Sequence, residues 1–412
     1  LTIDEMAEIT EEVALRNEPI RESGGDYMIR QVITRGTPFS NFGTQGGVLD
    51  PMTPTVINMA TPIRQGVHIE WYRTVCPGDD GSAIFVWSDT RYGMRNVFAQ
   101  KVDKHGNYKW GDSSGAAITD LPGRQEDPVA IEDGSGGAFI AWVDYRFDDS
   151  GDIFIQHVDD SGRVLMDSNG VALAQQTGQQ ISINMSTDSL GGVFVTWQDK
   201  RGGVDDDIYG THVDADHNIV SPGSGVSIVA EGGTQSAKSI EYAGNNETFI
   251  CWSDARLGEN IDIYGQRLDT SMQPVFQENG IPIANTSGLE TRPRTTFVNN
   301  TTSFVTWKSG DENARILYQF VDHTGLVFGD AKSVADSDAI QTAPRVKRSK
   351  SGEVFIQWKD LRFDAVDGDI FMQKIDTNGD ALWLNGVQVD PSDGVNFSGR
   401  FSANIAGGFN IF

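Results

Sequence analysis

Six tryptophans recur along this chain at an almost constant spacing. They are Trp87, Trp142, Trp197, Trp252, Trp307 and Trp358, so the intervals between them are 55, 55, 55, 55 and 51 residues. In the clearest copies each Trp ends an apolar phrase that follows two glycines, as in residues 136–142 and 191–197. A fixed period of this length indicates a repeat protein, and it overrides the two or three domains that 412 residues would otherwise suggest.

Each period contains four short apolar stretches separated by Gly, Asp and Asn. One stretch leads into the Trp, and the next ends near a Gln, as in residues 152–156 and 262–266. A turn then begins at a recurring Asp, found at Asp103, Asp159, Asp214, Asp269, Asp322 and Asp376. Four stretches of strand length in one fixed period are typical of a propeller blade.

A single four-stranded sheet of this size cannot bury both of its faces, whereas stacked blades bury their Trp, Phe, Ile and Val rows against each other. We therefore predict an all-β fold, a β-propeller of about seven four-stranded blades with an N-terminal extension; six or eight blades are the alternatives. Residues 1–66 form the predicted arm, with residues 44–65 as the candidate ring-closing strand. Residues 67–412 form the repeats. The next Trp is expected at position 413, so the last repeat is incomplete.

Five of the six tryptophans belong to the motif Trp-x-Asp-x-Arg. A single Asp and Arg beside an aromatic ring could form a substrate clamp, but a set that recurs in most blades predicts a structural role. The guanidinium would tie the hairpin that follows the Trp by binding the carboxylate or backbone carbonyl groups. The fifth repeat keeps Trp307 and loses the other two, which indicates either a binding face or sequence drift. The five sets are Trp87/Asp89/Arg91, Trp142/Asp144/Arg146, Trp197/Asp199/Arg201, Trp252/Asp254/Arg256 and Trp358/Asp360/Arg362.

The formal net charge is −26, from 58 acidic and 32 basic residues. Such a surface repels nucleic-acid phosphates and anionic lipid, so neither is an expected partner. No stretch approaches the roughly 20 apolar residues of a membrane helix, so no membrane insertion is expected. Cys76 and Cys251 are the two cysteines. Cys251 precedes Trp252 in an apolar run and is predicted to be buried, and a disulfide between the two is left open.

The loops that follow Arg146, Arg201 and Arg362 are acidic. Carboxylates of this density can coordinate Ca²⁺, and the candidates are Asp148, Asp152, Asp205 and Asp207. Neither loop has the Glu of a full EF-hand, and the alternative is a solvated acidic turn. No other cofactor is predicted. Nucleophile, acid–base and P-loop motifs predict no catalytic residue in this sequence.

The repeat as a whole resembles those of large secreted bacterial proteins. The motif is Gly-Gly-x-x-x-x-x-Trp-x-Asp-x-Arg, then Asp-Ile-Tyr-x-Gln, and it is seen in residues 136–162, 191–214 and 352–383. These proteins are often of the Bacteroidetes type and often carry a sorting domain for type IX secretion. The resemblance covers residues 68–412 and implies a propeller at the bacterial surface or outside the cell; it implies no activity.

These observations predict a secreted or cell-surface module that binds a protein or glycan and acts in adhesion or scaffolding. The repeats are regular, and no asymmetric catalytic set is visible. The alternative is a carbohydrate-active propeller, a hydrolase or lyase with carboxylates in the central funnel. Two carboxyl groups about 5–10 Å apart in a deep pocket would favour the enzyme.

Overall fold

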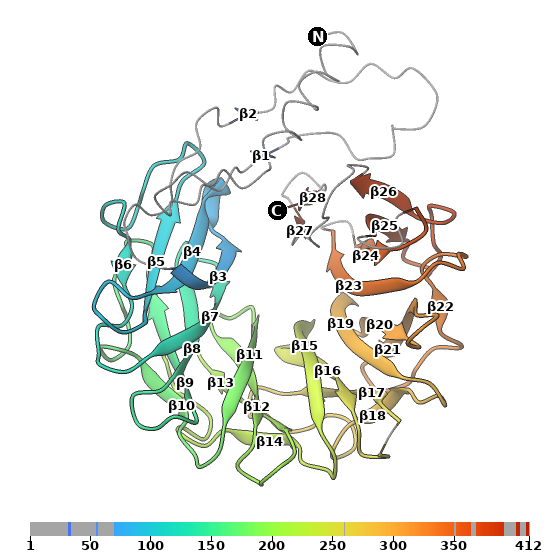
Figure 1. Ribbon diagram of the computed structural model, residues 1–412, viewed down its shortest axis with the longest axis horizontal. Helices are drawn as coiled ribbons and strands as arrows, with labels where there is room; N and C mark the ends of the chain where they lie inside the picture. The colour runs from blue at the N-terminus through green and yellow to red at the C-terminus, as the bar shows by residue number, and fades with distance from the viewer. Residues whose placement is uncertain are drawn as a thin grey trace.

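The computed structural model is a ring of small antiparallel sheets (Figure 1). It describes residues 32–33, 55–56, 70–258, 260–349, 352–363, 368–390, 401–403 and 409–411. Six four-stranded sheets follow one another along the chain, each built from four consecutive strands. Successive sheets stand side by side around a common centre, so the fold is the predicted β-propeller.

Each blade runs from an innermost strand to an outermost strand, and the blades are numbered 1 to 6 in chain order. The innermost strands are β3 (Glu70–Pro77), β7 (Gln125–Glu132), β11 (Gln180–Thr187), β15 (Gln235–Gly244), β19 (Glu290–Asn299) and β23 (Gln341–Arg348). The second strands are β4 (Ala83–Asp89), β8 (Ala138–Asp144), β12 (Val193–Asp199), β16 (Glu247–Asp254), β20 (Thr302–Ser309) and β24 (Val354–Asp360). The third strands are β5 (Asn96–Val102), β9 (Asp152–Val158), β13 (Asp207–Val213), β17 (Asp262–Leu268), β21 (Arg315–Asp322) and β25 (Asp369–Ile375). The outermost strands are β6 (Ala116–Ala117), β10 (Val171–Ala174), β14 (Val226–Val229), β18 (Ile281–Ala284), β22 (Lys332–Ser333) and β26 (Val387–Asp390).

The core lies between the blades. The second and third strands are buried on both faces, and every residue of β8 and β9 is buried. The repeat Trp of each of blades 2 to 6 packs against the preceding blade: Trp142 packs with Ile84 and Val97 of blade 1, and Trp358 packs with Tyr318 of blade 5. All six indoles are at most 3% exposed. Truncating a buried Trp lowers the free energy of unfolding by about 3–5 kcal/mol, so these rings contribute strongly to the packing between blades.

Two recurring polar residues fix the third strand and the turn that follows it. The Asp at the start of the turn accepts the backbone N–H groups two and four residues ahead, as Asp159 does from Ser161 at 2.9 Å and Arg163 at 3.0 Å. A buried Gln then ties the turn to the strand: Gln156 accepts from Met166 N–H and donates to the Asp167 carbonyl. These bonds account for the Gln and Asp that recur in the sequence.

A bulge interrupts the pairing of each innermost strand with its neighbour near the centre of the ring. In four blades a non-glycine residue of the bulge has positive φ: Asp127 (50°), Ser182 (57°), Arg292 (56°) and Ala343 (53°). Bulges re-aim side chains, and they are frequent beside binding sites. The centre of the ring is therefore where the blades depart from regular sheet geometry.

Two further sheets have two strands each. β27 (Phe401–Ala403) pairs with β28 (Phe409–Ile411) and contacts β23, the innermost strand of blade 6. This is the position at which a seventh blade would begin (Figure 1). β1 (Val32–Ile33) pairs with β2 (Thr55–Val56). Most of the arm, and most of the candidate ring-closing strand at 44–65, lie outside the described residues.

Over the described ranges, no helix has the length and apolar character needed to cross a bilayer. Cys76 and Cys251 are both buried free thiols, so the bridge that the sequence left open is not formed. Burial raises the pKa of each thiol to about 12.

Candidate functional site

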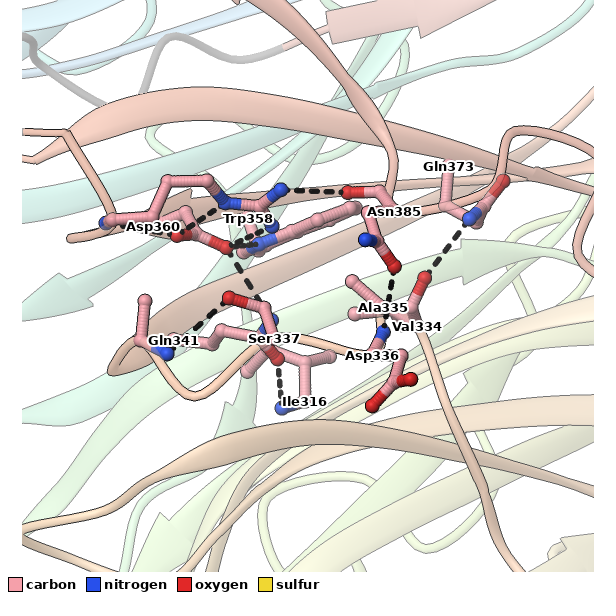
Figure 2. Close-up of polar contacts among 12 residues, drawn as sticks. Ile316, Val334, Ala335, Asp336, Ser337, Gln341, Trp358, Asp360, Gln373 and Asn385 are labelled. Carbon is pink, nitrogen blue, oxygen red and sulfur yellow. Dashed lines mark hydrogen bonds and ion pairs between the residues drawn. The ribbon is translucent and has the colours of Figure 1, made fainter.

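The Trp-x-Asp-x-Arg residues form one compact cluster in each of five blades, which we call the clamp. In blade 4 the Trp252 indole N–H donates to Asp254 at 2.7 Å, and Arg256 donates to the same carboxylate at 2.6 and 2.9 Å. The same bonds from Trp and Arg recur with Asp89, Asp144, Asp199 and Asp360. Figure 2 shows the clamp of blade 6, where Gln341 also donates to Asp360 at 3.3 Å.

The Arg of the clamp reaches the outer edge of its own blade. Its guanidinium donates to the carbonyl 23 residues later, two positions before the outermost strand, as Arg256 does to Asn279 at 2.9 Å. It also covers an aromatic ring of the third strand: Arg256 lies 4.0 Å from the Tyr264 centroid. The next residue, Gly280, has φ +81° and lies so close to the Trp252 ring that a side chain would clash with it. The clamp therefore joins the second, third and outermost strands of one blade.

The clamps of blades 2 and 3 correct the predicted role of the Arg in one respect. Arg146 and Arg201 each donate to the Asp of their own clamp at 2.5 Å, as predicted. Each also donates past the hairpin that it was predicted to tie: Arg146 to the Asn169 carbonyl at 2.9 Å, and Arg201 to the Ser224 carbonyl at 2.7 Å. To reach these carbonyls the arginines leave the core, and their side chains are 12% and 18% exposed while the Trp and Asp are fully buried. The predicted hairpin tie thus extends to the outermost strand of the blade.

In blades 1 and 6 the clamp carboxylate is held in its ionised form, and both of its oxygens accept hydrogen bonds. Burial by itself would raise the pKa of Asp89, but hydrogen bonds from Arg91 and Trp87 outweigh that effect and hold the pKa below its ordinary value. The pKa of Asp360 is lowered in the same way by Arg362 and Trp358. A carboxylate engaged in this way inside its own blade has little capacity left for a substrate. The geometry of the clamp is that of a structural tie.

Blade 5 satisfies its Trp from a different strand. Trp307 donates its indole N–H to Glu290 at 2.5 Å, and Ser309 and Thr286 donate to the other oxygen of the same carboxylate at 3.1 and 2.6 Å. Glu290 is the first residue of β19, and Ser309, which replaces the clamp Asp, is its cross-strand partner. In the sequence, Glu290 stands where blades 2, 3, 4 and 6 have Gln125, Gln180, Gln235 and Gln341.

The four calcium candidates lie in two neighbouring blades. Asp148 lies in the β8–β9 loop, where it accepts the N–H of Ser150 at 2.7 Å, and Asp152 begins β9. Burial raises the pKa of Asp152 to about 6, with help from Asp148 and Asp144. Asp205 lies in the β12–β13 loop and Asp207 begins β13, where burial again raises its pKa. Among the described residues, no three acidic, His or Cys side chains gather so as to hold a metal. The calcium site therefore stays a prediction.

A third set of polar residues ties neighbouring blades together at the ends of the third strands. Lys101 of blade 1 lies 2.5 Å from Asp79 of its own blade and also pairs with Asp160 of blade 2. In blade 2 the corresponding residue is His157, which lies 3.0 Å from Asp133 and 2.9 Å from His217 of blade 3. These contacts are shared between blades and are structural, like the clamps.

A groove lies across the innermost strands of blades 4, 5 and 6, with a volume of about 180 Å³. Its polar lining comes from β15, β19 and β23: Ser239, Glu241, Arg294, Thr295, Arg345 and Lys347. Glu241 and Lys347 approach to 3.7 Å across the groove, and the Thr295 N–H donates to the Ser239 hydroxyl at 3.2 Å. The sequence did not reveal this site, because its residues are about one or two repeats apart and belong to no shared motif.

The groove differs from the clamps because its residues do not repeat. One position, paired with the residue before each Trp, shows this best. It is occupied in blades 1 to 6 by Thr74, Val129, Asn184, Ser239, Arg294 and Arg345. Polar groups that converge on a concave surface and are not needed by the repeated architecture are the usual sign of a ligand site. The groove is the candidate functional site.

Comparison with known proteins places the fold and leaves the ligand open. No protein-family model and no curated protein matches this chain in sequence. Among solved structures it is similar to the BP39L lectin from Burkholderia pseudomallei, with 10% identity over 89% of this chain and 93% of the lectin and a TM-score of 0.53. It is also similar to a protein of unknown function from Dyadobacter fermentans, with 9% identity over 80% of this chain and 85% of that one and a TM-score of 0.41. An endo-arabinase from Bacteroides thetaiotaomicron gives 14% identity, 59% and 90% coverage and a TM-score of 0.35. At such identities the likeness concerns the fold, and the lectin match agrees with a propeller.

Proposed function

We propose that this protein is a secreted or cell-surface bacterial β-propeller that binds a glycan in the groove, as an adhesion or scaffolding module. One observation carries the proposal: the groove gathers polar side chains from three blades at positions that vary, while the clamps around it repeat. Hydroxyl, guanidinium, ammonium and carboxylate groups are the donors and acceptors that match sugar hydroxyls. The surface location is supported by the resemblance of the repeats to secreted bacterial proteins.

The size of the groove favours a sugar segment over a protein partner. A stable protein interface covers about 800 Å² on each partner, far more than a groove of about 180 Å³ can offer. A few sugar units need a small site with several convergent hydrogen-bonding groups. We therefore choose a glycan from the two ligand classes that the sequence left open.

The carboxylates of the groove favour binding over hydrolysis. A glycosidase places two carboxyl groups on either side of the bond that it cleaves. Within the described lining, Glu241 is the carboxylate, and Lys347 lies 3.7 Å from it. A single carboxylate does not supply the pair of carboxyl groups that glycoside hydrolysis needs. The enzyme alternative thus receives no support from the lining of this groove.

A steric block tests the proposal. The chain is screened against immobilised neutral and acidic glycans, and the best ligand is titrated by calorimetry into the wild type, Ser239→Phe and Ser271→Phe. Ser239 is half-buried in the groove, whereas Ser271 is exposed in the turn between β17 and β18. We expect Ser239→Phe to weaken binding roughly tenfold or more and Ser271→Phe to leave it unchanged. The proposal fails if no glycan binds, or if Ser239→Phe binds as well as the wild type.

A further inference from the structure

The innermost strands of blades 4 to 6 carry a charge opposite to that of the chain. β15, β19 and β23 contain six basic residues against two acidic ones, although the chain as a whole is at −26. The basic residues are Lys238, Arg292, Arg294, Arg345, Lys347 and Arg348, and the acidic ones are Glu241 and Glu290. On the other side of the ring, β7 has Glu126, Asp127 and Glu132 without a basic residue, and β11 has no charged residue. Among these innermost strands, the positive charge is therefore gathered on one side of the ring.

Three of these cations line the groove itself. Arg294 and Arg345 occupy the same position on adjacent blades, and Lys347 lies two residues beyond Arg345. Glu241 lies 3.7 Å from Lys347. A guanidinium presents a planar fork of donors that fits a carboxylate or sulfate with two parallel hydrogen bonds, and two such forks side by side fix the orientation of an acidic group.

The fold does not require the two groove arginines. Four blades form the same innermost strand with Thr74, Val129, Asn184 or Ser239 in that position. Lys238 shows the contrast: it is buried between blades, and its ammonium group donates to the Ser182 carbonyl. The repeated architecture does not account for the groove cations.

The positive surface continues past the groove along β23. The next residue after Lys347 is Arg348, whose guanidinium lies 4.7 Å from the Phe297 ring centroid of blade 5. Phe297 meets Tyr242 of blade 4 edge to face, with centroids 5.8 Å apart. All three side chains are half-buried. A half-buried aromatic row beside a row of cations can contact both the apolar face and the acidic group of a charged sugar.

We infer that the ligand of the groove is an acidic polysaccharide segment, with its carboxylate or sulfate group bound by Arg294, Arg345 and Lys347. This inference rests on the proposed glycan binding and names the class of glycan. Nucleic acid is the less suitable polyanion, because it carries a phosphate at every residue and its length would face the acidic remainder of the surface. Hyaluronan, by contrast, carries a carboxylate only on every second sugar.

The test compares acidic with neutral polymers. Wild type, Arg294→Gln, Arg345→Gln, the double variant and Ser239→Phe are titrated with polygalacturonate, hyaluronan, chondroitin sulfate and neutral dextran, and with an oligonucleotide and polyglutamate as polyanions that are not polysaccharides. Arg163→Gln is the matched control, because it removes the same charge from an exposed turn of blade 2, where Arg163 is 74% exposed. We expect the wild type to prefer at least one acidic polymer. Each groove variant should lose roughly tenfold in affinity, the control should match the wild type, and binding should weaken with added salt.

The outcomes separate this inference from the proposed function. Binding to dextran that the Gln variants preserve and Ser239→Phe abolishes would keep the glycan function and overturn the acidic ligand. Binding to no polysaccharide would overturn both. Binding to an oligonucleotide or to polyglutamate, but to no acidic polysaccharide, would overturn the ligand class. Circular dichroism and thermal melting of the double variant should match the wild type, since blades 1 to 4 fold without either Arg.

Discussion

Blades 4 and 5 provide a hydrogen-bond acceptor for the buried indole N–H of the repeat Trp in two different ways. In blade 4 the Trp252 indole donates to Asp254, two residues ahead on the same strand, and Arg256 joins that carboxylate to the outer edge of the blade. In blade 5 the carboxylate of Glu290 comes from the neighbouring strand, and no Arg is attached to it by the described contacts. What the repeat preserves is an acceptor for a buried indole N–H, because leaving that donor unpaired would cost about 1–3 kcal/mol.

The other clamp residues disappear together in blade 5. The ring that Arg256 covers in blade 4, Tyr264, corresponds to Leu317 in blade 5, and the glycine beside the Trp, Gly280, corresponds to Ala331. Because the Arg, the ring and the glycine make one structure, losing the Arg removes the constraint on the others. Blade 5 is therefore a variant of the repeat in which Glu290 replaces the clamp Asp as the acceptor. The sequence alone left two explanations open for this repeat, a binding face or sequence drift.

The largest expected effect comes from removing the blade 4 carboxylate. Asp254→Ala leaves the buried Trp252 N–H and the Arg256 charge without their partner, and we expect a loss of about 3–5 kcal/mol in the free energy of unfolding. Glu290→Ala should lose less, about 1–3 kcal/mol, because no buried cation depends on it. Urea denaturation of both variants measures the difference. Equal losses would show that the Arg adds nothing to the clamp.

Lys238 extends the comparison to blades 3 and 4, since Ile183 holds the corresponding place in blade 3. Burial lowers the pKa of Lys238 from 10.5 to about 7. The unfolded chain binds the proton more tightly, so wild-type stability rises between about pH 7 and 10.5. We expect Lys238→Ile to gain about 2 kcal/mol at or below pH 7 and to lose this advantage as the pH approaches 10.5. Melting curves across this range test it, and a gain independent of pH would contradict it.

Two substitutions can give blade 5 the cross-strand pair of blades 2, 3, 4 and 6, in which a Gln lies opposite the clamp Asp. Glu290→Gln removes the acceptor charge and should cost about 1–2 kcal/mol. Ser309→Asp places a second carboxylate opposite Glu290 and should cost a similar amount, because like charges on cross-strand partners repel. The double variant restores Gln opposite Asp, and we expect it to be more stable than the sum of the two losses predicts. A double-mutant cycle in urea measures this coupling; simple additivity would refute the compensation.

The residues of blade 1 suggest a substitution in blade 2 that should raise the stability of the protein by a smaller amount. Opposite its clamp Asp, blade 1 has Asn96, which donates to Leu121 at 2.9 Å and to Gln125 at 2.8 Å, whereas blade 2 has Asp152. The raised pKa of Asp152, about 6, means that the folded protein binds the proton more tightly, so stability falls as the pH rises from about 4 to 6. Asp152→Asn should gain about 1 kcal/mol above pH 6 and nothing below pH 4. A constant gain at all pH values would argue against this cause.

The calcium prediction can be tested on the same loop. If Ca²⁺ binds between Asp148 and Asp152, its charge relieves their repulsion, and the melting temperature should rise by a few degrees in wild type and not in Asp152→Asn. Magnesium, which requires a tighter octahedral site, is the comparison ion. An equal shift in melting temperature in both proteins, or no shift in either, would contradict the prediction of a calcium site in this loop.

The sequence was most informative where one residue type does the same work in every blade. The tryptophan period predicted the propeller, and the motif predicted that Asp and Arg meet. It did not predict that the Asp also accepts the Trp252 indole N–H, or that Arg256 reaches a carbonyl 23 residues away. Those contacts depend on how the outermost strand folds back, which residue spacing does not specify.

The groove could not be predicted from the sequence, for a related reason. Arg294 and Arg345 are 51 residues apart, and each stands alone among residues that vary from repeat to repeat. Only the stacking of blades brings them together, and the bulges of the innermost strands set the direction of their side chains. Glu290 was hidden by the same geometry, since it lies 17 residues before the Trp that it serves.

Each clamp is closed within its own blade, and this has a consequence for ancestry. A gene segment encoding one repeat carries every residue of its own clamp, so a duplicated copy would arrive with this tie already complete. The innermost strand contributes little to the clamp in most blades, so it can diverge after copying without undoing the tie. A ring that grew in this way would acquire new surfaces at its centre while its rim stayed the same.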